Sequence, residues 1–225
     1  SALGVNRFLE LKESGIISKS IKEGYLIDTY EINNENNINN NNEELILEHD
    51  KIDYVSYPYE WSFSQLKDAA IFHLDFHLFL LKNEATLVDA SAYNIQFIGS
   101  KLKFIDVLSI KKYNEGEYWQ GHKQFCENFL NPLILKSKKG IKFNNWFKGN
   151  LEGIQTSELN NLLNIFDKFS YNIFVHVHLL NKLEEKYTSK KTLKPINKVK
   201  NKITKKNLMA MLSQLRRFIL KLKDK

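Results

Sequence analysis

The sequence contains very little cysteine and no long hydrophobic run. Of its 225 residues only Cys126 is a cysteine, which excludes an internal disulfide and is typical of a reducing cytoplasm. The longest apolar run, Ile71 to Leu81, is interrupted by two histidines and an aspartate, so it is not a candidate membrane span. No signal-peptide pattern opens the chain. We therefore expect a cytoplasmic protein without a transmembrane segment, in which Cys126 is a small buried hydrophobic residue rather than a nucleophile.

Glycine and proline are also scarce, with nine and three residues. No glycine-rich phosphate loop precedes residue 57, and the chain contains no glycine-rich strand-to-helix turn that could hold S-adenosylmethionine. Asparagine, in contrast, forms an almost pure tract at 33–42. Because such a tract cannot bury apolar area, we expect it to be a loop between two strands.

Excess positive charge is confined to the end of the chain. Residues 181–225 carry fifteen Lys/Arg and three Asp/Glu, a net charge of +12, whereas the whole chain has +7, which leaves −5 for residues 1–180. A basic tail of this kind could contact nucleic acid or an anionic membrane surface. It lacks the interleaved aromatic residues of a nucleic-acid-binding module, so a solvated linker and surface helix is the favoured interpretation.

Hydrophobic periodicity divides the chain into three regions. Residues 1–56 are expected to form a small β-rich lobe, 57–185 a larger helical lobe, and 186–225 a basic linker with an amphipathic C-terminal helix. The expected strands of the first region are Gly15 to Ser20, Tyr25 to Ile32, Leu45 to Glu48 and Tyr54 to Ser56. The expected helices of the second are 63–82, 118–134, 156–169 and 173–185.

Three polar residues of the second region have the spacing found in phosphotransferases. Asp89 and Asn94 are five residues apart after an expected long helix, and Asp106 follows an expected hairpin twelve residues later. Phosphoryl transfer needs one carboxylate to orient the attacking hydroxyl, and a second carboxylate with an amide oxygen to hold the Mg²⁺ that bridges the phosphates of ATP. This arrangement resembles the protein-kinase-like and aminoglycoside-phosphotransferase-like families. The resemblance implies an α+β fold of two lobes, Asp89 as catalytic residue, Asn94 and Asp106 as metal ligands, and a small-molecule or sugar hydroxyl as acceptor.

The segment Tyr57-Pro58-Tyr59-Glu60 suits the crossover between the two lobes. Pro58 holds Tyr57 extended, and the backbone of an extended linker could pair with an adenine edge. Tyr57, Tyr59 and Glu60 are therefore candidate cofactor-binding residues. The alternative is that the aromatic rings plug the lobe junction and that Glu60 caps a local turn.

The sequence departs from the kinase-like motif at several positions. Leu87 stands where these families usually have His two residues before the catalytic Asp, and Asp106 is followed by Val107 and Leu108 rather than Phe-Gly. Lys19 and Lys22 lie in the right region for a nucleotide-binding lysine, but neither is singled out. Three alternatives follow: Asp89 and Asn94 only cap turns, the module is catalytically silent, or the chain is a helical interaction domain whose basic tail docks on an acidic partner.

A second resemblance covers roughly residues 7–135, with a weaker similarity in the final helix. Its motifs are Tyr57 to Ala70 (YPYEWSFSQLKDAA), Asp89 to Phe97 (DASAYNIQF), Phe104 to Asp106 and Gln124 to Cys126. They resemble the N-terminal region of bacterial proteins catalogued as class I S-adenosylmethionine-dependent methyltransferases, some of them nodulation-related. In such proteins this region precedes the methyltransferase domain. The resemblance implies that this domain is the partner, that S-adenosylmethionine does not bind this chain, and that the region supports methylation by another part of the protein.

Histidines offer a competing metal hypothesis. His73 and His77 are four apart on an expected helix, so both could bind one ion, whereas His176 and His178 suit opposite sides of an element. No third ligand is fixed by the spacing. The favoured interpretation is that these are core or boundary histidines.

Overall fold

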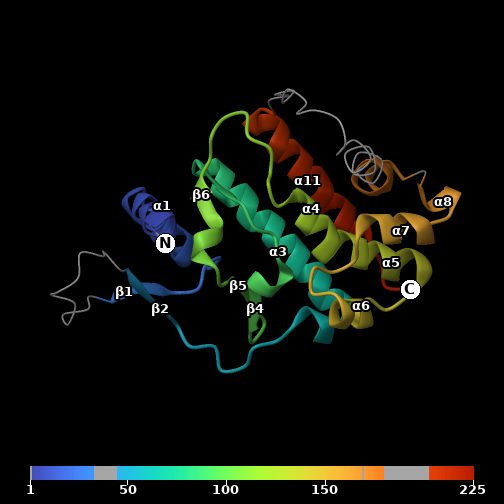
Figure 1. Cartoon of the computed structure of the whole chain (residues 1–225), viewed down its shortest axis with the longest axis horizontal. Helices are drawn as coiled ribbons and strands as arrows, with labels where there is room; N and C mark the ends of the chain where they lie inside the picture. The colour runs from blue at the N-terminus through green and yellow to red at the C-terminus, as the bar shows by residue number, and fades with distance from the viewer. Residues whose placement is uncertain (1, 33–44, 169, 180–202) are drawn as a thin grey trace, which may run out of the picture.

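The computed structural model describes residues 2–32, 45–168, 170–179 and 203–225. Within these residues the fold is organised around one long central helix, α3 (Phe63–Lys82), which agrees with the predicted helix 63–82 (Figure 1). The Ser62 hydroxyl accepts from the backbone N–H of Gln65, and the Gln65 side chain accepts from the N–H of Ser62. This reciprocal capping satisfies two N–H groups that the first turn of a helix leaves unpaired.

The C-terminal helix α11 (Lys205–Lys221) lies along α3 (Figure 1). Its buried apolar face consists of Leu208, Leu212, Leu215 and Ile219. Arg216 binds Asp75 of α3 through both carboxylate oxygens, at 2.5 and 2.9 Å, a geometry that fixes orientation as well as charge. The amphipathic helix predicted from the sequence is therefore confirmed, and its partner surface lies on this chain.

The described part of residues 1–56 is mixed rather than β-rich. It contains α1 (Ala2–Glu13), α2 (Ile16–Lys22) and one antiparallel hairpin of β1 (Thr29–Ile32) and β2 (Ile46–His49), in which Tyr30 faces Glu48. The strand predicted for Gly15 to Ser20 is wrong. Gly15 turns the chain with a φ of +72°, and Ile16, Ile17 and Ser20 are then buried at helical spacing. The predicted strand 54–56 is likewise not a strand.

Two further strand pairs follow α3. β3 (Ala85–Leu87) pairs antiparallel with β6 (Ile110–Lys112), and the hairpin of β4 (Ile95–Ile98) and β5 (Lys101–Phe104) lies between them in sequence. Gly99 makes the hairpin turn with a φ of +61°, which a residue without Cβ adopts at little cost. Short 3₁₀ turns η1 (Pro58–Glu60), η2 (Ala92–Asn94) and η3 (Val107–Ser109) join these elements.

The remaining helices lie to one side of α3, and part of this group contacts α3 directly (Figure 1). They are α4 (His122–Phe125), the π-helical turn η4 (Cys126–Leu130), α5 (Asn131–Lys139), α6 (Asn144–Gly149), α7 (Thr156–Leu162), α8 (Ile165–Lys168), α9 (Tyr171–Ile173) and the π-helical η5 (Phe174–Leu179). The first three run on continuously, so the predicted helix 118–134 begins and ends later than expected. The predicted helix 156–169 is interrupted at Asn164, which exchanges side-chain–backbone bonds with Asp167.

Three predictions lie outside the described residues: the asparagine loop, the end of the helix predicted for 173–185, and most of the basic linker. In the part of the chain that is described, no helix has the length and apolar character needed to span a bilayer.

Packing of α11 on α3 generates a stability prediction. Leu212 is fully buried in this interface, whereas Leu220, on the same helix, is 46% exposed. We expect Leu212→Ala to lower the free energy of unfolding by about 2–5 kcal/mol, because it removes buried contacts and leaves a cavity. Leu220→Ala should change it by less than about 1 kcal/mol. Urea unfolding followed by circular dichroism measures both, and equal effects would contradict this packing.

Candidate functional site

The candidate site is built from the loop after β3 and the segment after the β4–β5 hairpin. Val88 N–H donates to the Ser109 carbonyl at 2.9 Å, which continues the β3–β6 pairing up to Asp89. Ile105 N–H donates to the Asn94 carbonyl at 2.9 Å, which places Asn94 beside the residue that precedes Asp106. Backbone pairing thus brings the three sequence-predicted residues to one region, in the predicted order of long helix, loop, hairpin and Asp.

Both carboxylates also stabilise local turns. Asp89 Oδ1 accepts from the N–H of Ser91 at 2.6 Å. Asp106 Oδ1 accepts from the N–H of Leu108 at 3.0 Å, and its Oδ2 accepts from the Ser109 hydroxyl. The turn-capping role weighed as an alternative is therefore present. The carboxylates keep further binding capacity, because each oxygen has two lone pairs and can accept a second partner or bind a cation.

Two side-chain amides, one partly buried and one buried, hold the backbone of the Asp89 loop. Gln124 Oε1 accepts from the N–H of Ala90 at 2.8 Å, and Asn128 Oδ1 accepts from the N–H of Ala92 at 3.1 Å. The same Asn128 donates through Nδ2 to the Glu152 carbonyl at 3.0 Å, and its side chain is 1% exposed. Sequence reasoning included Gln124 only in a family motif and missed Asn128. The available signal was an amide pair at i and i+4, which places both side chains on one face of the helix.

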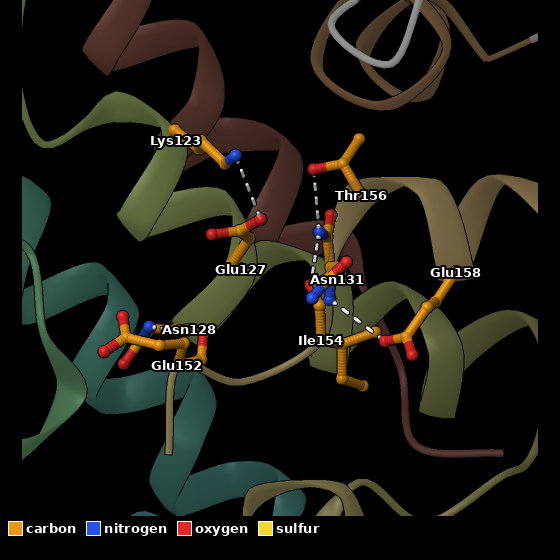
Figure 2. A network of polar contacts seen from close by, with 9 residues as sticks. Lys123, Glu127, Asn128, Asn131, Glu152, Ile154, Thr156 and Glu158 are labelled. Atoms are coloured by element: carbon orange, nitrogen blue, oxygen red, sulfur yellow. Dashed lines mark hydrogen bonds and ion pairs between the residues drawn. The ribbon is translucent and has the colours of Figure 1, made fainter. Parts of the chain in front are cut away.

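The segment 152–156 is fixed to the same helix by a polar network (Figure 2). Ile154 N–H donates to the Glu127 carbonyl at 3.0 Å. Asn131 Nδ2 donates to the Ile154 carbonyl at 2.9 Å and to the Thr156 hydroxyl at 3.2 Å. A Cβ on Gly153 would lie 2.3 Å from the Glu127 carbonyl oxygen, so only glycine permits this close approach. The helix that holds the loop is thereby anchored on its other side.

The crossover segment lies against β4, close to the loop. Ser56 exchanges two hydrogen bonds with the buried side chain of Gln96, at 3.0 and 3.1 Å. The Tyr57 and Tyr59 rings stack with centroids 5.2 Å apart. Burial raises the pKa of the Tyr93 phenol, with smaller contributions from Tyr59 and Glu152, so the crossover approaches the loop at Tyr93.

Several polar groups of this crossover already have hydrogen-bond partners in the chain. Glu60 accepts from the N–H of Tyr57 at 2.9 Å, and Asn144 donates to the Tyr59 carbonyl at 2.9 Å. Glu60 therefore caps a turn, as the alternative proposed, and an adenine edge would have to displace it to reach the Tyr57 N–H. Lys19, a candidate nucleotide-binding lysine, donates to Asn83 at the C-cap of α3, at the opposite end of β3 from the Asp89 loop.

A cavity of about 790 Å³ lies elsewhere, at the C-terminal end of α11. Its lining includes Lys138, Arg217 and Lys221 and shares no residue with the Asp89 loop. The cavity therefore does not contribute to the candidate site.

The histidines of α3 belong to the core, as favoured from the sequence. His73 and His77 are fully buried, and their rings meet edge to face with centroids 6.4 Å apart. His77 Nε2 lies 2.8 Å from the Thr86 hydroxyl, and His73 Nε2 lies 3.5 Å from the Asp89 carbonyl, directly under the loop. Burial lowers the pKa of His73 to about 4, so it is neutral at physiological pH.

The amide contacts predict what loss of Asn128 does. Asn128→Ala leaves the Ala92 N–H and the Glu152 carbonyl without their partner; the buried N–H alone costs about 1–3 kcal/mol, and the lost amide packing adds to this. We expect a loss of about 2–4 kcal/mol in the free energy of unfolding, and faster hydrogen exchange at the amides of 90–94. Exchange monitored by mass spectrometry measures this, with Asn145→Ala on an exposed position as control. Unchanged exchange in the loop would contradict the anchoring role.

Burial of His73 predicts a pH dependence. In the unfolded chain a histidine binds its proton near pH 6.5, whereas folded His73 binds it only near pH 4. The unfolded state therefore binds more protons between these values, and the free energy of unfolding falls as pH decreases through that window. His73→Phe should remove about 2–3 kcal/mol of the decrease between about pH 7 and 4.5. Urea titrations at both pH values measure it, with exposed His49→Phe as control. An unchanged decrease in His73→Phe would contradict the prediction.

Comparison with known proteins gives one curated relative. The chain is 44% identical over 178 residues, 79% of its length, to nodulation protein NoeA of Rhizobium meliloti (strain 1021). That stretch is 37% of the relative, so the chain spans little more than a third of its length. No protein-family model matches the chain. No solved structure matches it either, so the kinase-like fold stays a prediction. The similarity supports a relationship to nodulation-related bacterial proteins over most of this chain.

Proposed function

We propose that this chain is a kinase-like module of a larger bacterial protein and that it binds Mg–ATP at the Asp89 loop. In this assignment Asn94 and Asp106 hold Mg²⁺, which prefers oxygen ligands, and Asp89 orients the hydroxyl of a small-molecule or sugar acceptor. As the hydroxyl oxygen bonds the γ-phosphorus, its proton passes to Asp89 and ADP leaves. The observation that carries the proposal is the joining of the Asp89 loop to Asp106 by the β3–β6 pairing and the Asn94–Ile105 bond.

Anchoring of the loop by hydrogen bonds supports the same assignment. Catalysis of phosphoryl transfer depends on positioning and on charges fixed in advance, and little covalent work falls to the protein. The amides of Gln124 and Asn128 hold the backbone of the loop at Ala90 and Ala92, on either side of Ser91. Two side chains that are distant in sequence, one of them fully buried, thus hold the loop at two points.

A second candidate is a catalytically silent kinase-like module that supports a methyltransferase domain. Two observations favour it: Lys19 is bound at the far end of β3, and the crossover N–H of Tyr57 is taken by Glu60. The relative is much longer than this chain, which leaves room for such a domain in a parent protein. The cytoplasm is the proposed location in either case. The third alternative is a helical interaction domain whose basic tail docks on an acidic partner. The apolar face of α11 is not available for such docking because it is buried on α3, which leaves the Lys and Arg side chains as the docking groups of this alternative.

The proposal predicts Mg²⁺-dependent binding of ATP. At ATP and Mg²⁺ about tenfold above the dissociation constant, the melting temperature should rise by about 3–5 °C. Asp106→Asn keeps an oxygen for the N–H of Leu108 but removes the charge, so its rise should be below about 1 °C. The exposed Asp53→Asn is the matched control and should behave as wild type. Thermal shift with and without Mg²⁺ measures all three.

Two results would overturn this proposal: no Mg²⁺-dependent rise in the melting temperature of the wild type, or the same rise in Asp106→Asn. Turnover against a panel of sugars and amino alcohols then separates the two candidates. ADP release that is lost in Asp89→Asn supports a phosphotransferase. Binding without ADP release supports the silent module.

A further inference from the structure

A second cluster of chemically active side chains lies apart from the Asp89 loop. His122 Nε2 is 3.1 Å from His176 Nδ1, and Cys126 Sγ is 3.8 Å from His122 Nε2. One ligand atom from each of the three residues lies within 4.8 Å of the other two. Among the described residues this is the one group of three or more His, Cys, Asp or Glu with that geometry. The sequence-based description of Cys126 as a plain hydrophobic residue is therefore incomplete.

The spacing within the cluster is close to that of a tetrahedral metal site. Zinc binds histidine nitrogen at about 2.0–2.1 Å and thiolate sulfur at about 2.3 Å, which places two nitrogens about 3.3 Å apart and a nitrogen and a sulfur about 3.6 Å apart. Two of the three observed separations, 3.1 and 3.8 Å, differ from these by a few tenths of an ångström, and the third, between Cys126 and His176, is within 4.8 Å. Rotation of the side chains about χ1 and χ2 is enough to accommodate such differences.

The elements that carry the three residues are unusual. His122 and Cys126 lie at i and i+4, so they share one face of the helix, and Cys126 begins the π-helical turn η4. His176 lies in the second π-helical turn, η5. π-helical turns are rare and often occur at functional sites, where they redirect side chains that a regular helix would separate. Here the two described π turns meet at this cluster.

The neighbouring histidines have other partners. His178, two residues from His176, contacts Asn160 at 3.2 Å, and His77 contacts Thr86. The cluster therefore consists of His122, Cys126 and His176.

Protonation also suits metal binding. Cys126 and His176 are buried, and desolvation lowers the pKa of both His122 and His176 to about 4. Both imidazoles are therefore neutral at physiological pH, the form in which histidine donates to a metal. A divalent cation would also favour the thiolate of Cys126, which gives the site two nitrogen ligands and one sulfur ligand.

We propose that His122, Cys126 and His176 form a binding site for a divalent cation of the zinc type. Two imidazoles and a thiolate suit borderline-soft transition metals and not Mg²⁺, so this site is chemically distinct from the one proposed at Asp106. Three protein ligands leave a fourth position for water or a small anion. The cation ties residues 171–179 to the helix that anchors the Asp89 loop.

Co²⁺ tests the proposal in the wild-type chain without any variant. Because Cys126 is the single cysteine of the sequence, a thiolate-to-cobalt charge-transfer band can arise from no other residue. We expect a 1:1 complex with this band and a tetrahedral d–d spectrum, and displacement of Co²⁺ by Zn²⁺. Isothermal titration with Zn²⁺ should give the same stoichiometry. Absence of 1:1 binding, or a cobalt complex without the sulfur band, would overturn the proposal.

Variants then assign the ligands. Cys126→Ala and His176→Gln should each weaken Zn²⁺ binding by at least about 100-fold and abolish the Zn²⁺-dependent rise in melting temperature. His178→Gln, on the same π-helical turn, should bind as the wild type does. Circular dichroism of the metal-depleted variants checks that they fold. Wild-type affinity in a folded Cys126→Ala protein would rule the site out.

Discussion

The side-chain amide of Asn128 is the interaction on which the rest of the site depends. Its oxygen accepts from the loop at Ala92 and its nitrogen donates to the carbonyl of Glu152, so one buried group connects three chain segments. Amides suit this task because they offer a donor and an acceptor together and carry no charge that burial would penalise. A carboxylate at this position would face the Glu152 carbonyl with no proton to donate. The two buried residues of the loop, Ala90 and Ala92, thereby have partners for their N–H groups without belonging to a sheet.

The π-helical turn makes this geometry compatible with a continuous helix. In η4 the N–H of Asn131 reaches back to the carbonyl of Cys126, one residue further than in an α-helix. This widening leaves the Glu127 carbonyl to accept from Ile154, in the space that Gly153 keeps open by lacking a Cβ. The widened turn, Gly153 and the amide side chains therefore depend on one another, because each makes room for or satisfies a contact of the others.

The sequence predicted those parts of the fold that depend on local pattern. The central helix 63–82, the C-terminal helix and the strands on either side of Gly99 follow from periodicity and turn chemistry, and the structure has them. The segment Gly15 to Ser20 was predicted as a strand because a short run of Ile and Ser fits both the strand period and the helix period. Packing against α1 stabilises the helix instead. The partners of Gln124 and Asn128 could not be predicted, because they lie between 24 and 36 residues away in sequence. Cys126 follows His122 by four residues, but His176 of the same cluster lies 54 residues from His122, and no local pattern indicates that contact.

One helix presents two chemically different faces, and this separates the two proposed sites. Successive α-helical residues are rotated by about 100°, so Gln124 lies roughly 200° from His122, and the pairs 122/126 and 124/128 point to opposite sides. The amide pair faces the Asp89 loop, and the His–Cys pair faces His176 of η5. A cation bound on one side would hold the helix without touching the loop on the other. Any influence of that cation on Mg–ATP would then pass through the backbone of residues 122–130, and binding at either site should survive loss of the other's ligands.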